Sequence, residues 1–119
     1  MSKTEEETAS DAKILVVDDN EDNRFTLVRR LKRTGYQHIE VAADGKEALA
    51  KLASDPYDLV LLDIMMPVMN GYEVLEHLKK DMRLRHIPVV MISAADDLES
   101  VVKCIELGAE DFLPKPFNA

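Results

Sequence analysis

Residues 59–67 read Leu-Val-Leu-Leu-Asp-Ile-Met-Met-Pro. The four apolar residues at the start are typical of a buried strand, and Asp63 stands where that strand should end and a turn should begin. Three further apolar segments also end in polar side chains: 14–17 before Asp18 and Asp19, 89–92 before Ser93, and 112–114 before Lys115. Open α/β sheets carry their sites at the carboxyl ends of the strands. The pattern therefore predicts one polar site where four strands end.

Helical patterns separate these strands along the chain. The expected strands cover residues 13–17, 38–42, 59–62, 87–92 and 111–113, and the expected helices cover residues 21–34, 46–54, 72–80 and 98–107. Such alternation implies right-handed crossovers and a doubly wound, five-stranded parallel sheet of the α/β class. Pro114 has no N–H to donate to a ladder, so the last strand is expected at an edge of the sheet. On the first helix, Phe25, Val28 and Leu31 are expected to form the apolar face, with Leu27 beside them.

Composition restricts the class of protein. The chain has 119 residues, of which 46% are hydrophobic and 32% charged, and these values indicate one globular domain. The formal net charge of −8 argues against direct nucleic acid binding, because there is no excess of Lys and Arg to neutralise phosphates. Residues 1–12 contain Glu5-Glu6-Glu7 and lack apolar periodicity, so we interpret them as an acidic N-terminal extension of a domain at residues 13–119.

The sequence also indicates the cellular compartment of the protein. No apolar run approaches the roughly 20 residues that a membrane-spanning helix needs. The first residues lack the cationic and apolar segments of a signal peptide. Cys104 is the single cysteine, and a chain with one cysteine forms no internal disulfide, which fits a reducing compartment. We therefore expect a cytoplasmic protein that does not contact a membrane.

Three carboxylates should meet at the predicted site. Asp18, Asp19 and Asp63 would follow neighbouring strands, and like charges within a few ångströms raise one another's pKa. Such a cluster persists when a cation neutralises it, and a hard divalent ion prefers oxygen ligands. Mg²⁺ fits best, because it takes few carboxylates and keeps positions for water and a phosphoryl group. The three histidines are scattered without ligand spacing, which argues against zinc.

Lys115 and Ser93 extend this chemistry. An ammonium group and a hydroxyl group beside a metal ion and a carboxylate form a set that can bind a phosphoryl group. A carboxylate in that set can attack phosphorus and form an acyl phosphate. Each residue alone has an ordinary structural explanation: Asp18 and Asp19 as helix caps, Asp63 and Ser93 as turn residues, and Lys115 as a solvated surface residue.

Four segments together resemble the receiver domain of two-component response regulators, and the resemblance covers residues 13–118. They are 16–20 (Val-Val-Asp-Asp-Asn), 61–71 (Leu-Leu-Asp-Ile-Met-Met-Pro-Val-Met-Asn-Gly), 92–94 (Ile-Ser-Ala) and 112–117 (Phe-Leu-Pro-Lys-Pro-Phe). Each segment is weak evidence alone, and their order and spacing make the match specific. The resemblance implies the flavodoxin-like strand order 2-1-3-4-5, which is the order of the doubly wound example that includes a member of this family.

The resemblance also implies roles for individual residues. Asp63 looks like the phosphoacceptor, and Lys115 would pair with the phosphoryl oxygens. Asp19 looks like a direct Mg²⁺ ligand, Asp18 would act mainly through metal-bound water, and the backbone carbonyl of Met65 would complete the protein ligands. Ser93 and Phe112 look like the switch hydroxyl and the switch aromatic residue.

These roles imply a phosphorylation switch that catalyses only its own phosphorylation and dephosphorylation. The phosphodonor would be a sensor histidine kinase or a phosphotransfer protein, as in a phosphorelay, and a C-terminal output domain would respond. The family has a helix after the fifth strand, and this chain ends at Ala119 without it. We therefore expect residues 13–119 to be a receiver domain truncated before its last helix, with one helix covering the second face of the sheet. The apolar surface left uncovered there would favour a homodimer.

Three other functions are weighed against this one. A degenerate receiver would act only as a protein-interaction module, and the complete acidic set argues against it. A phosphatase of the haloacid dehalogenase type would need a second Asp two residues after the nucleophile, where this chain has Met65. A flavodoxin-like electron carrier would need a loop rich in Ser, Thr and Gly after the first strand, where this chain has residues 18–22, Asp-Asp-Asn-Glu-Asp.

Overall fold

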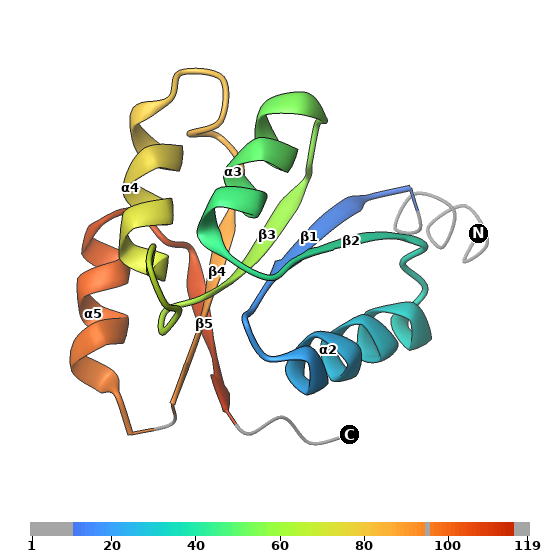
Figure 1. Ribbon diagram of the computed structural model, residues 1–119, viewed down its shortest axis with the longest axis horizontal. Helices are drawn as coiled ribbons and strands as arrows, with labels where there is room; N and C mark the ends of the chain where they lie inside the picture. The colour runs from blue at the N-terminus through green and yellow to red at the C-terminus, as the bar shows by residue number, and fades with distance from the viewer. Residues whose placement is uncertain (1–10, 95, 116–119) are drawn as a thin grey trace.

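The computed structural model describes residues 11–94 and 96–115 of the chain. Strands and helices alternate throughout this part (Figure 1). The strands are β1 (Lys13–Val17), β2 (His38–Ala42), β3 (Leu59–Asp63), β4 (Val89–Ala94) and β5 (Asp111–Lys115). The helices are α2 (Glu21–Thr34), α3 (Gly45–Ser54), α4 (Gly71–Lys80) and α5 (Leu98–Glu106). The acidic extension lies, except for residues 11 and 12, outside the described residues.

The five strands form one parallel sheet in the order β2-β1-β3-β4-β5. The doubly wound fold class and the order 2-1-3-4-5 are therefore confirmed. β5 lies at an edge, as Pro114 predicted. The register places Val17 of β1 opposite Leu62 of β3, and Asp63 opposite Ile92 of β4. The carboxyl ends of the three central strands consequently lie side by side.

Helices cover the two faces of the sheet unequally in the described part of the chain. α3, α4 and α5 lie on one face and α2 lies on the other (Figure 1). The strand residues alternate between two apolar cores, with Leu15, Val60 and Leu62 in the core under α3 and α4. Ile14 and Val16 belong to the core under α2. Self-association through the α2 side of the sheet stays a prediction.

The face of α2 that packs on the sheet differs from the expected one. Leu27 is 3% exposed and Leu31 packs against the same core, whereas Phe25 is 66% exposed. The spacing of apolar residues shows that a helix has an apolar face. How the helix packs on the sheet decides which residues of that face are buried. Here Leu27 and Leu31, four residues apart, contact the sheet, and Phe25 points into solvent.

Three strands extend further than expected at the end that carries the predicted site. β3 includes Asp63, β4 includes Ser93, and β5 runs to Lys115. Backbone pairing continues past the apolar residues, since the N–H of Ile64 donates to the carbonyl of Ile92 at 3.0 Å. The polar side chains are therefore held by the sheet itself.

The helix caps are also resolved. Asn20, Asp44, Asn70 and Asp97 are the N-caps of α2, α3, α4 and α5, and each side chain accepts from a backbone N–H three residues later. Asn20 caps α2, so Asp18 and Asp19 remain available for other contacts.

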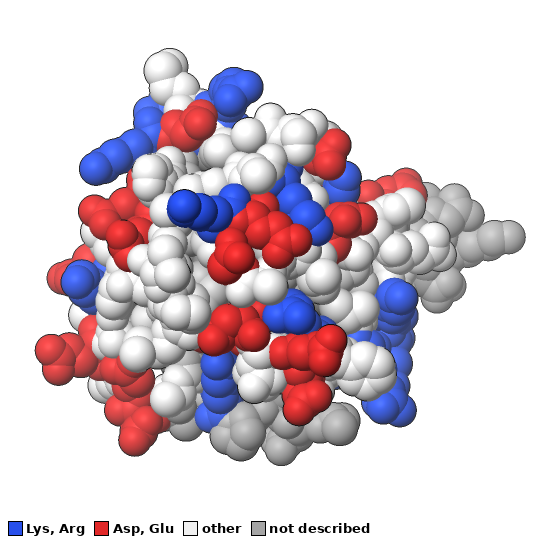
Figure 2. Space-filling view, viewed as in Figure 1, with Lys and Arg blue, Asp and Glu red and all other residues white. Residues whose placement is uncertain are grey.

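Charges of both signs are mixed over the visible surface. On the face shown in Figure 2, Lys and Arg side chains stand in small groups among Asp and Glu, without a broad basic area. Within residues 11–94 and 96–115, no helix is both long and apolar enough to cross a bilayer.

Candidate functional site

Three carboxylates converge where β1 and β3 end. One side-chain oxygen from each of Asp18, Asp19 and Asp63 lies within 4.8 Å of the others. Asp18 and Asp63 are buried, at 0% and 1% exposure, and Asp19 is exposed. Asp18 and Asp19 are consecutive, Asp63 is distant from both in sequence, and the pairing of β1 with β3 brings it beside them. We refer to these three residues as the acid cluster.

Asp63 lies at the centre of the polar contacts. Its Oδ1 accepts from Lys115 Nζ at 3.2 Å and from the N–H of Met65 at 3.4 Å. Its Oδ2 is buried without a hydrogen-bond partner among the described residues. Burial, followed by the charge of Asp18, raises the pKa of Asp63 to about 6, and the ammonium group of Lys115 opposes this rise. A bound cation would favour the ionised carboxylate.

Asp18 likewise has one carboxylate oxygen that accepts a hydrogen bond and one that does not. Its Oδ1 accepts from the N–H of Asn20 at 2.9 Å. Its Oδ2 is buried, lies 3.7 Å from Lys115 Nζ, and has no hydrogen-bond partner in the described part of the structure. Lys115 thus lies between the two buried carboxylates, and Oδ2 of each lacks a hydrogen-bond partner within the described residues.

Ser93 adds a third buried oxygen at this end of the sheet. It is 2% exposed on β4, directly after the residue that pairs with Asp63. Its Oγ also has no hydrogen-bond partner within residues 11–94 and 96–115. Buried polar atoms are normally paired, so unpaired oxygens at one end of a sheet point to a ligand that would pair them.

This arrangement suits a hard divalent cation together with an oxyanion. Carboxylate oxygens are the ligands that Mg²⁺ prefers, and the unpaired oxygens of Asp18 and Asp63 fit that role. Lys115 and Ser93 supply an ammonium group and a hydroxyl group that suit the oxygens of a phosphoryl group. Among the described residues, no second group of three His, Cys, Asp or Glu side chains has metal-binding spacing.

The other two predicted site residues, Met65 and Phe112, do not contribute side chains to the acid cluster. The backbone N–H of Met65 donates to Asp63 at 3.4 Å and its side chain is exposed. The role of its backbone carbonyl stays a prediction. Phe112 lies on the edge strand β5 and is 40% exposed. The structure therefore brings Asp18, Asp19, Asp63 and Lys115 together, places Ser93 at the end of the adjacent strand, and leaves Phe112 at the edge.

Sequence reasoning missed two residues that contact Asp18. Asn20 binds its carboxylate, and Arg24 Nη1 donates to its backbone carbonyl at 2.7 Å. The Asn20 contact could have been predicted from a cap residue two positions after an Asp. No signal in the sequence distinguishes Arg24 from the other basic residues of the same helix.

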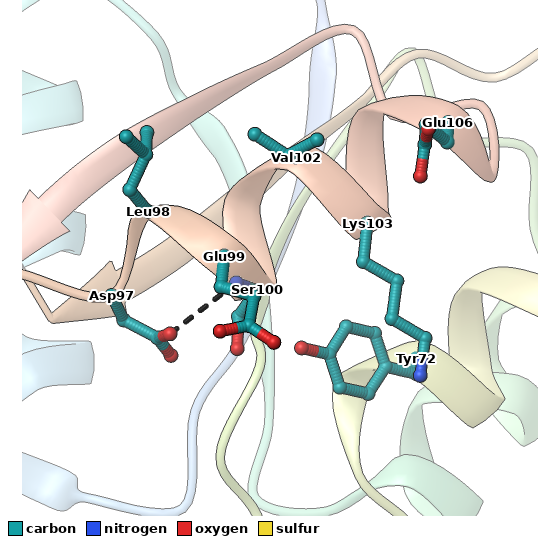
Figure 3. Close-up of a pocket in the computed structure, with 8 residues that line it drawn as sticks. All are labelled: Tyr72, Asp97, Leu98, Glu99, Ser100, Val102, Lys103 and Glu106. Atoms are coloured by element: carbon teal, nitrogen blue, oxygen red, sulfur yellow. Dashed lines mark hydrogen bonds between the residues drawn. The ribbon is translucent and has the colours of Figure 1, made fainter.

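A hollow of about 910 Å³, away from the acid cluster, lies between α4 and α5 (Figure 3). Lys103 Nζ lies 4.3 Å from the centre of the Tyr72 ring, and Asp97 accepts from the N–H of Ser100. Leu98 and Val102 point away from Tyr72 in this view. The polar groups here cap a helix or cover a ring, so this hollow lacks the converging unpaired atoms of the acid cluster.

The family model described as "Response regulator receiver domain" matches residues 14–119. The chain belongs to this family. The match covers all of the described sheet except Lys13 and includes every residue of the acid cluster. The predicted resemblance and the predicted function as a receiver domain of two-component signalling are confirmed.

Relatives of this receiver domain agree with that assignment. It is 47% identical to response regulator PleD of Caulobacter vibrioides over 107 residues, which are 90% of this chain and 23% of PleD. It is 43% identical to a probable cyclic di-GMP phosphodiesterase of Vibrio cholerae, over 94% of this chain and 25% of that protein. Against the crystallised chemotaxis response regulator CheY4 of Vibrio cholerae, the TM-score is 0.83 at 36% identity, over 90% of this chain and 88% of CheY4. The receiver domain thus spans about a quarter of the two curated relatives named here.

Proposed function

We propose that Asp63 accepts a phosphoryl group from a sensor histidine kinase or a phosphotransfer protein, in a reaction that depends on Mg²⁺. The observation that carries this proposal is the state of the buried oxygens at the strand ends. Asp63 is held by Lys115 through one oxygen, while its other oxygen and Oδ2 of Asp18 have no hydrogen-bond partner within the described residues.

Each residue of the site has a role in this reaction that fits its position. Asp18, Asp19, Asp63 and the backbone carbonyl of Met65 would hold Mg²⁺, which when bound neutralises charge on the carboxylates and on the transferring phosphoryl group. A carboxylate oxygen of Asp63 attacks phosphorus, a P–O bond forms, and the P–N bond of a phosphohistidine donor breaks. Lys115 and Ser93 contact the phosphoryl oxygens, because an ammonium group and a free hydroxyl group stand at this end of the sheet.

Met65 makes this site a switch and not a general phosphatase. A phosphatase that uses an aspartyl phosphate would need an acid near the leaving group, and residue 65 carries an exposed thioether chain. The acyl phosphate would therefore persist until water hydrolyses it. During that time Ser93 would bind the phosphoryl group, and Phe112, now 40% exposed on β5, would turn inward. An output domain elsewhere in the full-length protein would respond to that change.

The test is phosphorylation by acetyl phosphate in the presence of Mg²⁺, followed by mass spectrometry of the intact chain. The wild type should gain one phosphoryl group that is stable in acid and is removed by hydroxylamine, and this label should require Mg²⁺. Asp63→Asn should not be labelled. Asp11→Asn, which removes an exposed carboxylate before β1, is the matched control and should be labelled like the wild type. Undiminished labelling of Asp63→Asn would overturn the assignment.

A further inference from the structure

Arg24 differs from the other basic residues of α2. The other four, Arg29, Arg30, Lys32 and Arg33, are exposed. Arg24 is half-buried, and its Nη1 donates to the backbone carbonyl oxygen of Asp18 at 2.7 Å. This hydrogen bond joins the first turn of α2 to the segment that carries two carboxylates of the acid cluster.

The contact completes the anchoring of Asp18. Its N–H donates to the carbonyl of Ala42 at 3.2 Å, and its Oδ1 accepts from the N–H of Asn20 at 2.9 Å. With Arg24 on the carbonyl, the backbone N–H, the backbone C=O and one carboxylate oxygen are all engaged. Oδ2 is then the oxygen of Asp18 that is available to a bound ion.

Asp19 depends on the same contact in a different way. Its side chain is exposed, so the backbone sets its position more than packing does. The peptide unit between Asp18 and Asp19 is a rigid plane, and its oxygen is the atom that Arg24 binds. Fixing that oxygen therefore fixes the direction in which the chain enters Asp19.

We propose that Arg24 is a positioning residue for the divalent cation site: it holds the Asp18–Asp19 peptide so that both carboxylates face Asp63. This inference rests on the proposed Mg²⁺ site. Arg24 does not bind the ion itself. Its positive charge repels a cation, so loss of the charge alone would tighten ion binding. If Arg24 positions the carboxylates, its loss weakens Mg²⁺ binding instead. The direction of the change in Kd therefore distinguishes the two effects.

The experiment is calorimetric titration of the full 119-residue chain with MgCl₂. Arg24→Met should raise the Kd for Mg²⁺ by roughly tenfold or more, as losses of groups that orient metal ligands do. Arg24→Lys keeps the charge and one donor group, so its Kd should lie between those of the wild type and Arg24→Met. Arg29→Met removes the same charge from an exposed position of the same helix and should bind Mg²⁺ within about twofold of the wild type.

Thermal unfolding without Mg²⁺ serves as the second measurement. If Arg24 only stabilises the fold, Arg24→Met would lower the melting temperature but leave the Kd of the folded protein for Mg²⁺ unchanged. That result would overturn the inference. An Arg24→Met chain that binds Mg²⁺ as tightly as the wild type, or more tightly, would also overturn it. If Arg24→Met does not fold, a tenfold loss of affinity for Arg24→Gln together with an Arg24→Lys Kd between those of the wild type and Arg24→Gln would support it, and unchanged affinity in both variants would refute it. Failure of the wild type to bind Mg²⁺ would instead overturn the proposed function.

Discussion

Val68 has a backbone conformation that a β-branched residue adopts at a cost. It lies in the turn between β3 and α4 with φ at 68°, and it is the single residue other than glycine with positive φ in the described part of the chain. Its side chain is 92% exposed, so few contacts offset the strain. The left-handed conformation costs a residue other than glycine roughly 1–2 kcal/mol.

Val68→Gly should therefore stabilise the protein. The relief of strain is partly offset by the greater freedom of glycine in the unfolded chain, so we expect a gain of about 0.5–1 kcal/mol in the free energy of unfolding. Urea denaturation with an unchanged m-value measures it. Val68→Ile keeps the β-branch and serves as the control, with a stability close to that of the wild type. A Gly variant less stable than the wild type would show that the turn is not strained.

The contacts within the acid cluster could be predicted only in part from the sequence. The sequence correctly indicated carboxylates, an ammonium group and a hydroxyl group at strand ends, because residue types and apolar runs are visible in one dimension. It did not show that Lys115 binds one oxygen of Asp63 and leaves the other buried without a partner among the described residues. Which oxygen of Asp63 is paired depends on the distance between β5 and β3, and the pairing of the strands in the sheet sets that distance.

At the scale of elements, the site depends on how closely α4 starts to the end of β3. Gly71 is the first residue of α4, and its N–H donates to the carbonyl of Ile64 at 2.8 Å. A Cβ at this position would lie 2.4 Å from the carbonyl oxygen of Asp63 and 2.7 Å from the Cα of Ile64. Both are backbone atoms, so a larger residue displaces either the helix or the strand end.

Gly71→Ala should destabilise the protein by about 2 kcal/mol, the middle of the range for overpacking, although Ala otherwise favours a helix over Gly. Gly45→Ala is the matched control, because Gly45 is the first residue of α3 and its Cβ would meet side-chain atoms of Val74 and Met69. The flexible Met69 side chain can move and a side chain gives way more readily than backbone, so the loss should be smaller. Chemical denaturation compares the two, and a Gly71→Ala protein as stable as the wild type would contradict the close approach.

At the scale of the whole molecule, the two faces of the sheet are covered differently. In the described residues, α3, α4 and α5 share one face while α2 covers the other alone. Leu27 is the one residue of α2 that is buried, and Leu31 packs beside it against the same core. The docking of α2 also places Arg24 against the end of β1.

Leu27→Ala should lower the free energy of unfolding by about 2–4 kcal/mol, as large-to-small substitutions in a core do. Phe25→Ala removes a larger apolar side chain from the same helix but should change stability by less than about 0.5 kcal/mol, because Phe25 is exposed. Hydrogen exchange should show faster exchange in α2 than in α4 for Leu27→Ala. A Phe25→Ala variant as unstable as Leu27→Ala would contradict the observed docking.

Local sequence patterns were enough to predict the order of the elements, the parallel sheet and the polar residues at the strand ends. These features follow from local patterns: apolar runs make strands, periodic stripes make helices, and polar side chains follow the strand ends. Three features could be seen only in the folded chain: which face of α2 is buried, that Ser93 and Lys115 still belong to strands, and that Arg24 reaches Asp18. Each of these depends on distances between segments remote in sequence, which are set when the strands pair and the helices pack on the sheet.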